Sequence, residues 1–321
     1  MIEKTNNYLS APMPYFGGKA SVADEIWAAL GDVKHYMEPF AGSCAVLLAR
    51  PGYNPMRHVE TICELDPLVA NAWRAMHFKP DETARYCDWP ISHCDLSARK
   101  LRMLAEKNDL RDKLIADENY CDCKLAGYWV WAANCWIGSG LTSIGQRPHL
   151  TNAGTGVHKT GMITNEPQTD LNAPYNPNIY LWFRRLSERL RHVRMVCGDW
   201  KRICGGNWQA DMGTVGIFFD PPYGVRDRYN VYGDTDDFNV AHEVRDWCLE
   251  RGKLPSYRIV LAGYDEHDEL LLRGWAAKQW KTCGGYGNVA RSGKVSRGQK
   301  NGHREVLYFS PHCIAGQGSL F

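Results

Sequence analysis

The sequence lacks the long apolar stretch that a membrane protein needs. Its longest apolar stretches, residues 44–49 and 126–138, are shorter than the roughly 20 residues of a membrane-spanning helix. Residues 1–19 include acidic and amide side chains and no continuous apolar segment, so they do not match a secretory signal. We therefore expect no membrane association and a cytoplasmic location.

Clustered cysteines are also missing. The twelve cysteines extend from Cys44 to Cys313 without a Cys-x-x-Cys pair, and the closest two are Cys121 and Cys123. A disulfide framework or a structural zinc site would require tighter clusters. We predict that the thiols are reduced and buried in the fold, and that the protein holds no metal ion.

Two nucleotide-binding motifs are absent. A P-loop around Gly17-Gly18-Lys19 would need glycine at Met13 and a hydroxyl residue at Ala20. The turn at residues 38–43 has one glycine instead of the three in the dinucleotide motif G-x-G-x-x-G. These absences argue against nucleoside triphosphate hydrolysis and against a dinucleotide cofactor.

An excess of one charge is absent too, because 38 Lys and Arg residues against 36 Asp and Glu residues give a net charge of +2. A polyanion partner must therefore meet a local basic patch. Residues 184–194 hold five arginines opposed in sequence by Glu188 alone, and they form either a solvated helix face or a binding surface. Residues 284–304 are rich in glycine and contain no acid, which favours nucleic-acid phosphates as their ligand.

What the sequence does contain is an alternation of β-rich runs and helices, which predicts an α/β sheet with helices on both faces. The predicted strands are residues 33–37, 58–63, 193–197, 215–219, 258–262 and 306–309. The predicted helices include residues 22–30, 44–50, 68–78 and 240–251. Ser21, with Asp24 three residues later, is the predicted cap of the first helix.

The middle of the chain has a different composition. Residues 138–178 contain six glycines and four prolines, which indicates an insertion without regular structure. The preceding residues, 81–138, have helical signals and end in an aromatic run. This run, Tyr128, Trp129, Trp131 and Trp136, is more typical of a core than of a platform for stacking bases.

In an open sheet of this kind, ligands bind at the carboxyl ends of the strands. The first predicted strand leads into the turn Glu38-Pro39-Phe40-Ala41-Gly42-Ser43, where a small turn beside an acid suits a positively charged cofactor without phosphate. The second leads to Glu64 and Asp66, and a carboxylate there can accept hydrogen bonds from both ribose hydroxyls. Together they predict a nucleoside pocket, although acids at strand ends also serve as helix caps.

The most specific motif is Asp220-Pro221-Pro222-Tyr223, which directly follows the apolar residues 215–219. The two prolines fix the backbone and remove amide donors, so the turn presents carbonyl oxygens and one carboxylate. Acceptors without competing donors suit a substrate amine, and the tyrosine offers a flat face for stacking. A rigid turn with a capping aspartate is the structural alternative.

With these motifs in this order, the sequence resembles the D12-class (Dam-like) DNA adenine-N6 methyltransferases. The resemblance is carried by Tyr15-Phe16-Gly17-Gly18-Lys19, residues 38–43, Gly198-Asp199-Trp200 and residues 220–223, and it covers residues 14–76 and 193–309. It implies a Rossmann-like S-adenosylmethionine-dependent methyltransferase sheet with an inserted target-recognition domain. The implied catalytic domain comprises residues 1–80 and 193–321, and the implied DNA-binding insertion comprises residues 81–192.

The resemblance also implies roles for individual residues. The implied S-adenosylmethionine site consists of Tyr15, Phe16, Gly17, Lys19, Glu38, Pro39, Phe40, Ala41, Gly42, Ser43, Glu64, Asp66, Asp199 and Trp200. Glu64 stands where the family commonly has aspartate, so either Glu64 or Asp66 holds the ribose. The implied catalytic residues are Asp220, Pro221, Pro222 and Tyr223, and the implied DNA contacts are Arg291, Lys294, Arg297, Lys300 and Arg304.

The implied reaction is the transfer of a methyl group to the N6 amine of adenine at a specific site in double-stranded DNA, after the base has been flipped out. The alternatives are a cytosine-N4, RNA or protein-glutamine methyltransferase of related fold, and a non-catalytic DNA-binding protein that has kept the fold. We expect a monomer associated with DNA in a bacterial or phage-infected cell. Any cognate restriction enzyme would act as a separate protein.

Overall fold

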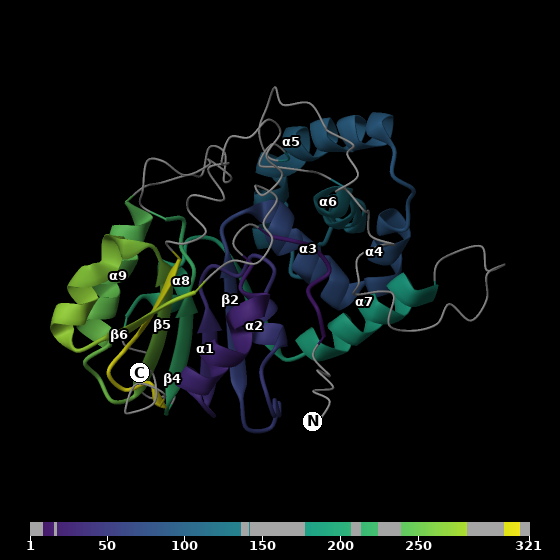
Figure 1. The fold of residues 1–321 in the computed structure, drawn as a ribbon. Coiled ribbons are helices and arrows are strands. Elements are labelled where there is room, and N and C mark those ends of the chain that lie inside the picture. Colours follow the sequence, from purple (N-terminus) through teal and green to yellow (C-terminus); the bar gives the residue numbers. More distant parts are fainter. Residues whose placement is uncertain are drawn as a thin grey trace, which may run out of the picture.

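The computed structural model describes residues 9–15, 18–135, 141, 177–206, 213–223, 239–280 and 305–314. These residues contain a seven-stranded sheet with the strand order β3-β2-β1-β4-β5-β7-β6 (Figure 1). Its strands are β1 (His35–Glu38), β2 (Val59–Glu64), β3 (Val193–Cys197), β4 (Val215–Phe219), β5 (Tyr257–Gly263), β6 (Ala276–Gln279) and β7 (Val306–Phe309). The pairs among β1 to β5 are parallel, whereas β7 runs antiparallel to β5 and β6.

The helices include all four that were predicted, at residues 22–30, 44–50, 68–78 and 240–251. The described helices are α1 (Ala23–Leu30), α2 (Ala45–Leu48), α3 (Pro67–Phe78), α4 (Pro80–Cys87), α5 (His93–Ala116), α6 (Cys123–Cys135), α7 (Pro177–Leu190), α8 (Lys201–Cys204) and α9 (Val240–Arg251), with the 3-10 segments η1 (Ala20–Val22) and η6 (Asp265–Arg273). Helix α3 is capped at its start by the Asp66 carboxylate, which accepts a hydrogen bond from the Leu68 amide at 2.9 Å.

Helices cover both faces of the sheet, which confirms the predicted fold class. Successive side chains of a strand point to opposite faces, and in β4 the buried Ile217 and Phe218 belong to two different core clusters. Phe218 packs in the cluster that includes residues of α1 to α7, and Ile217 packs in the cluster with residues of α8 and α9. The architecture is a mixed α/β sheet, which is consistent with the Rossmann-like methyltransferase fold that the sequence resemblance implies.

Helices α3 to α7 lie together beside the β2–β3 side of the sheet (Figure 1). Their packing is dominated by aromatic side chains: Trp131 is fully buried and Trp129 nearly so. The Arg99 guanidinium lies 4.3 Å from the ring centroids of both Tyr128 and Trp131. A core role of the aromatic run is therefore confirmed for Trp129 and Trp131. Trp136 lies outside the described residues.

The arginine-rich residues 184–194 are helical up to Leu190, and two of the arginines have acidic partners that the local sequence does not show. Arg189 forms an ion pair with the fully buried Glu60 of β2 at 2.7 Å. Arg184 forms an exposed pair with Asp81 of α4, also at 2.7 Å. Part of this basic stretch thus serves the packing of α7 against its neighbours.

Other details differ from the sequence-based expectations. The predicted cap of α1 at Ser21 is wrong, because residues 20–22 form the 3-10 turn η1 and the helix starts after Val22 without a side-chain cap. Strand β6 was not predicted, because three of its four residues are exposed and it has no apolar run. Most of the predicted insertion 138–178 lies outside the described residues, and the division into two domains stays a prediction.

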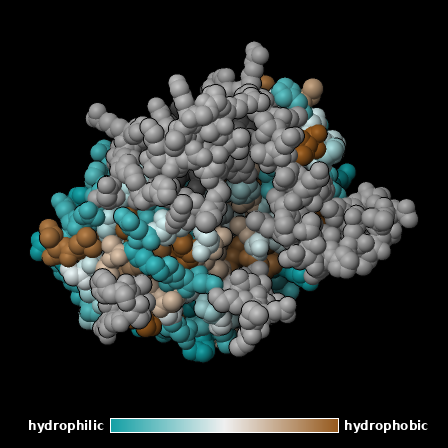
Figure 2. All heavy atoms as spheres, in the orientation of Figure 1, coloured by the Kyte–Doolittle hydropathy of each residue, from teal (hydrophilic) through white to brown (hydrophobic). Residues whose placement is uncertain are grey.

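Most cysteines of the described residues are buried free thiols, and the described surface is mixed in polarity (Figure 2). The eleven cysteines within the described ranges are free thiols, and nine of them are buried, as predicted. In Figure 2, hydrophilic residues cover much of the described surface, and hydrophobic residues form separate patches among them. Among the helices that the structure describes, none has the length and apolar character to cross a membrane.

Candidate active site

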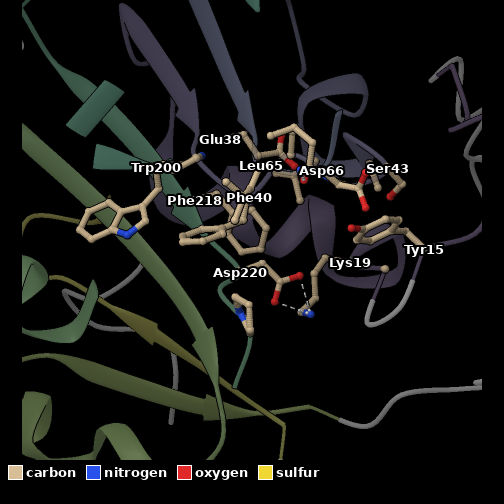
Figure 3. A pocket seen from close by; sticks show the side chains of 18 of the residues that line it. Tyr15, Lys19, Glu38, Phe40, Ser43, Leu65, Asp66, Trp200, Phe218 and Asp220 are labelled. Carbon is tan, nitrogen blue, oxygen red and sulfur yellow. Dashed lines mark hydrogen bonds and ion pairs between the residues drawn. The ribbon is translucent and has the colours of Figure 1, made fainter. Parts of the chain in front are cut away.

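A pocket opens at the carboxyl ends of β1, β2, β3 and β4, with an empty volume of about 890 Å³ that includes its part open to solvent. Most of the predicted cofactor and catalytic residues line it (Figure 3). These are Tyr15, Lys19, Glu38, Pro39, Phe40, Ala41, Gly42, Ser43, Glu64, Asp66, Asp199, Trp200, Asp220 and Pro222. Residues far apart in the sequence thus meet at the edge of the sheet where ligands of open α/β sheets bind.

The turn after β1 is held in place by specific contacts. Gly42 has a φ of 45°, and a Cβ atom on it would lie 2.7 Å from the ring of Tyr15, so glycine allows that ring to pack against the turn. The Ala41 amide donates to the Cys63 carbonyl at 3.0 Å, and the Trp73 indole donates to the Gly42 carbonyl at 2.8 Å. The turn is therefore tied both to β2 and to α3.

Glu38 lies at the floor of the pocket and is 3% exposed. Its Oε2 atom accepts hydrogen bonds from the Tyr36 hydroxyl and the Leu47 amide, both at 3.1 Å. Burial raises the pKa of Glu38 to about 8, against the effect of these hydrogen bonds, and the nearby Asp220 raises it further. A positive charge entering the pocket would favour the ionised form.

Glu64 and Asp66 stand on opposite sides of the exposed Leu65 and have different partners. Glu64 accepts the Gly42 amide at 2.9 Å and the Asp66 amide at 3.0 Å, and burial raises its pKa to about 7. Asp66 caps α3 through one oxygen and forms an ion pair with Lys107 at 2.8 Å through the other. Both line the pocket, and both have structural partners: Glu64 accepts backbone amides, whereas Asp66 caps a helix and pairs with a lysine.

Apolar side chains form the walls between these acids. Phe40, Leu65 and Phe218 line the pocket, and the sequence analysis missed the last two. The Trp200 indole extends away from the acidic side chains (Figure 3) and packs 6.0 Å from Phe219, so much of this ring belongs to the core. Phe218 could have been found from strand alternation, because it lies two residues before Asp220 and points to the same face.

Asp220 follows β4 and is paired with Lys19. The Lys19 ammonium lies 2.9 Å from both carboxylate oxygens of Asp220, and the two side chains are 2% and 20% exposed (Figure 3). Burial raises the pKa of Asp220, whereas the charge and hydrogen bonds of Lys19 lower it. Lys19 therefore favours the carboxylate, which accepts hydrogen bonds but donates none.

The remaining predicted site residues are not among the described residues that line the pocket. Pro221 is buried in the turn, and Tyr223 lies beside Lys19, with its hydroxyl 3.1 Å from the ammonium. Glu305 was not predicted from the sequence, and its carboxylate accepts a hydrogen bond from the Tyr223 hydroxyl at 2.7 Å. Phe16 and Gly17, together with the predicted DNA contacts Arg291, Lys294, Arg297, Lys300 and Arg304, lie outside the described residues.

Comparison with known proteins identifies one part of this site. Residues 15–58 match the family model described as D12 class N6 adenine-specific DNA methyltransferase, and this segment contains Tyr15, Lys19 and the whole turn after β1. No curated protein matches the chain. The resemblance inferred from the sequence is thereby confirmed: over residues 15–58 the chain is similar to the D12 class N6 adenine-specific DNA methyltransferases.

Proposed function

We propose that the protein is a site-specific methyltransferase that transfers a methyl group from S-adenosylmethionine to the N6 amine of adenine in double-stranded DNA. One observation carries the proposal. The same pocket holds buried acids with apolar walls, which suit a cationic nucleoside, and the Asp220 carboxylate on the rigid turn after β4. The family match at residues 15–58 supports the same reaction.

The residues present fit S-adenosylmethionine, which supplies the methyl group on a positively charged sulfur. Glu64 would accept hydrogen bonds from the ribose hydroxyls through further lone pairs of its two oxygens, which accept backbone amides in the fold. Asp66 is the weaker candidate, because it caps α3 and forms an ion pair with Lys107. Phe40, Leu65 and Phe218 provide apolar surface for the adenine ring of the cofactor. Glu38 would balance the positive charge in the ionised form.

Asp220 and Pro221 would act on the substrate amine. The nitrogen lone pair of adenine N6 is delocalised into the ring, which makes it a poor nucleophile. The Asp220 carboxylate and the Pro221 carbonyl would accept the two amine hydrogens, draw the nitrogen toward tetrahedral geometry and free its lone pair. Each carboxylate oxygen has a second lone pair, so Lys19 can keep its hydrogen bonds while the amine binds. The proton that the methylated amine loses would pass to Asp220.

The target base must leave the duplex to reach this pocket, at a cost of a few kcal/mol. The Tyr223 ring would stack on the flipped base. Contacts to the DNA backbone from the basic residues 291–304 would offset the cost of flipping. The predicted insertion 81–192 would contribute sequence recognition.

Methyl transfer to DNA tests the proposal. The protein is incubated with duplex DNA of mixed sequence and S-adenosylmethionine that carries a labelled methyl group, and the DNA is digested to nucleosides. We expect the label in N6-methyladenine, a loss of at least about 100-fold in D220A, and cofactor binding in both proteins. As a matched control, D246A removes an exposed aspartate of α9 and should keep full activity.

The position of the label also separates the alternatives. Label in N4-methylcytosine would show that the target base is cytosine and not adenine. Measurable cofactor binding without label on DNA would contradict the proposal and direct the search to RNA or protein substrates. DNA binding without cofactor binding would instead indicate a non-catalytic DNA-binding protein.

A further inference from the structure

We propose that Glu305 is a positioning residue that fixes the Tyr223 ring, and that it acts through the Tyr223 hydroxyl. The inference rests on the proposed function, in which this ring stacks on the target base. Neither the sequence motifs nor the match at residues 15–58 includes Glu305. Its place in the structure, directly before β7, brings it to the side of the catalytic turn.

The contact between the two side chains is short and shielded from water. The Tyr223 hydroxyl lies 2.7 Å from Oε2 of Glu305, and Glu305 is 6% exposed. A hydrogen bond to a buried charged acceptor stabilises more than one between neutral groups. The residues are 82 positions apart in the chain, so the tertiary fold creates this contact.

The directions of the hydrogen bonds follow from the donors present. The Lys19 ammonium has donors only, so at 3.1 Å it donates to the Tyr223 oxygen while it also donates to Asp220. The Tyr223 hydroxyl has two acceptors within reach, Glu305 at 2.7 Å and Asp220 at 3.5 Å, and the shorter contact directs its proton to Glu305. One chain of hydrogen bonds therefore joins the catalytic carboxylate to Glu305 through Lys19 and Tyr223.

The backbone of Glu305 is fixed by the sheet. Its carbonyl accepts a hydrogen bond from the Trp280 amide at 3.0 Å, and the next residue, Val306, pairs with Gly263 of β5. A carboxylate on such a backbone is a rigid acceptor. Burial raises the pKa of Glu305, and the charges of Asp220 and Glu266 raise it further, while Lys19 and the Tyr223 hydroxyl act in the opposite direction.

The Tyr223 ring is held at two places. Its hydroxyl donates a hydrogen bond to Glu305, and its ring makes a T-shaped contact with the ring of Tyr264, with centroids 4.5 Å apart and an interplanar angle of 60°. Tyrosine has two side-chain torsions, and fixing both the oxygen and the ring plane determines them. Glu305 thereby sets the plane that the flipped base would meet, because stacking energy depends on parallel ring planes.

Two variants of similar size separate this role from simple packing. E305M fills the same space without an acceptor, whereas E305Q keeps an amide oxygen that accepts the hydroxyl proton. We expect E305M to lower kcat/KM for DNA methylation about tenfold, as for the loss of one hydrogen bond to a charged group. E305Q should stay within about threefold of the wild type. The affinity for S-adenosylmethionine should be unchanged, because Glu305 is not part of the pocket wall.

A double-mutant cycle with Y223F tests whether Glu305 acts through the hydroxyl. If it does, E305M should lower kcat/KM less than about twofold in the Y223F protein. An equal loss in both backgrounds, or an E305Q protein as impaired as E305M, would overturn the proposal. So would a parallel loss of cofactor affinity in E305M, because that is the signature of a general structural defect.

The free energy of unfolding provides a readout that does not depend on activity. A double-mutant loss of stability smaller than the sum of the Y223F and E305M losses supports the hydrogen bond, and additive effects would refute it. If this non-additivity is present but the wild type methylates no adenine in DNA, the proposed function itself is wrong. If the wild type is active but the kinetic cycle is additive, the role of Glu305 alone is wrong.

Discussion

At the scale of single residues, the protonation of the buried acid Glu38 should change when a cation binds in the pocket. Glu38 is buried at the pocket floor, and burial raises its pKa to about 8 from an ordinary value of 4.5. Its uncharged form therefore predominates at neutral pH in the protein alone. A bound cation would lower this pKa, and binding then releases a proton.

We therefore predict that the affinity for S-adenosylmethionine rises with pH between about 6.5 and 8.5. The gain is about tenfold for each pKa unit by which the bound cation shifts Glu38. Titration calorimetry in buffers of different ionisation enthalpy measures both the affinity and the proton release. The E38Q variant should show a flatter profile above pH 7, and an unchanged profile in E38Q would contradict the assignment.

The raised pKa of Glu38 has the opposite effect on stability, which should fall as pH rises. The folded protein binds an extra proton at Glu38 between the ordinary pKa of 4.5 and the raised value of about 8. The contribution of this group to the free energy of unfolding therefore decreases as pH rises through this range. Thermal unfolding of the wild type and E38Q at pH 5 and pH 8 should show a larger gain for E38Q at the higher pH.

Glu64 and Asp66 provide a second prediction for single residues. If Glu64 holds the ribose, E64Q should weaken cofactor binding about tenfold, as for one hydrogen bond to a charged group. D66N keeps a capping oxygen for α3, so it should change the affinity less than about twofold and stability by less than about 1 kcal/mol. Equilibrium binding and urea unfolding check both, and the reversed order of affinities would assign the ribose to Asp66.

At the scale of secondary-structure elements, an ion pair with β2 holds α7 against the sheet. Arg189 reaches Glu60 of β2 at 2.7 Å, and Arg50 lies 3.3 Å from the same carboxylate. The Arg189 guanidinium also lies 3.9 Å from the ring centroid of Tyr53. Glu60 is fully buried, so its two arginine partners keep a charge inside the protein that would otherwise be strongly unfavourable.

We predict that R189A destabilises the protein by about 2 kcal/mol. This is less than the roughly 3–5 kcal/mol of a fully unpaired buried charge, because Arg50 still faces Glu60. R184A, which removes the exposed pair with Asp81, should cost less than about 1 kcal/mol. Urea unfolding compares the two, and equal losses would contradict this account of α7.

The elements themselves could largely be predicted from the sequence. All six predicted strands are present, and five of them are mostly buried, whereas β3 at one edge of the sheet is only partly buried. Strand β6 was missed because its register depends on pairing with β7 at the edge of the sheet. The start of α1 was misjudged because the 3-10 turn η1 precedes the helix.

The site was predictable only where its residues form local motifs. The turn after β1 and the residues 220–223 follow apolar strands directly, so their position at the sheet edge follows from strand direction. Glu305 carries no such signal, because a single acid before a strand is common and its partner is 82 positions away. Lys19 and Asp220 each lie in a predicted motif, but the contact between them was not predicted, because they are 201 positions apart.

At the scale of the whole molecule, DNA affinity should depend on a local basic segment, because the net charge is only +2. We predict that replacing Arg291, Lys294, Arg297, Lys300 and Arg304 by glutamine weakens DNA binding for all sequences alike. The slope of log affinity against log salt concentration should fall by about 0.9 for each lost phosphate contact. An unchanged affinity and slope would show that DNA is held elsewhere.

Methylation of adenine at a specific DNA sequence can be observed in living cells. The protein is expressed in a bacterium that lacks its own adenine methyltransferases, and N6-methyladenine is mapped along the genome. We expect methylation of nearly every copy of one short sequence, and none in cells that express D220A. A genome without N6-methyladenine, despite a folded protein that binds S-adenosylmethionine, would contradict the proposed function.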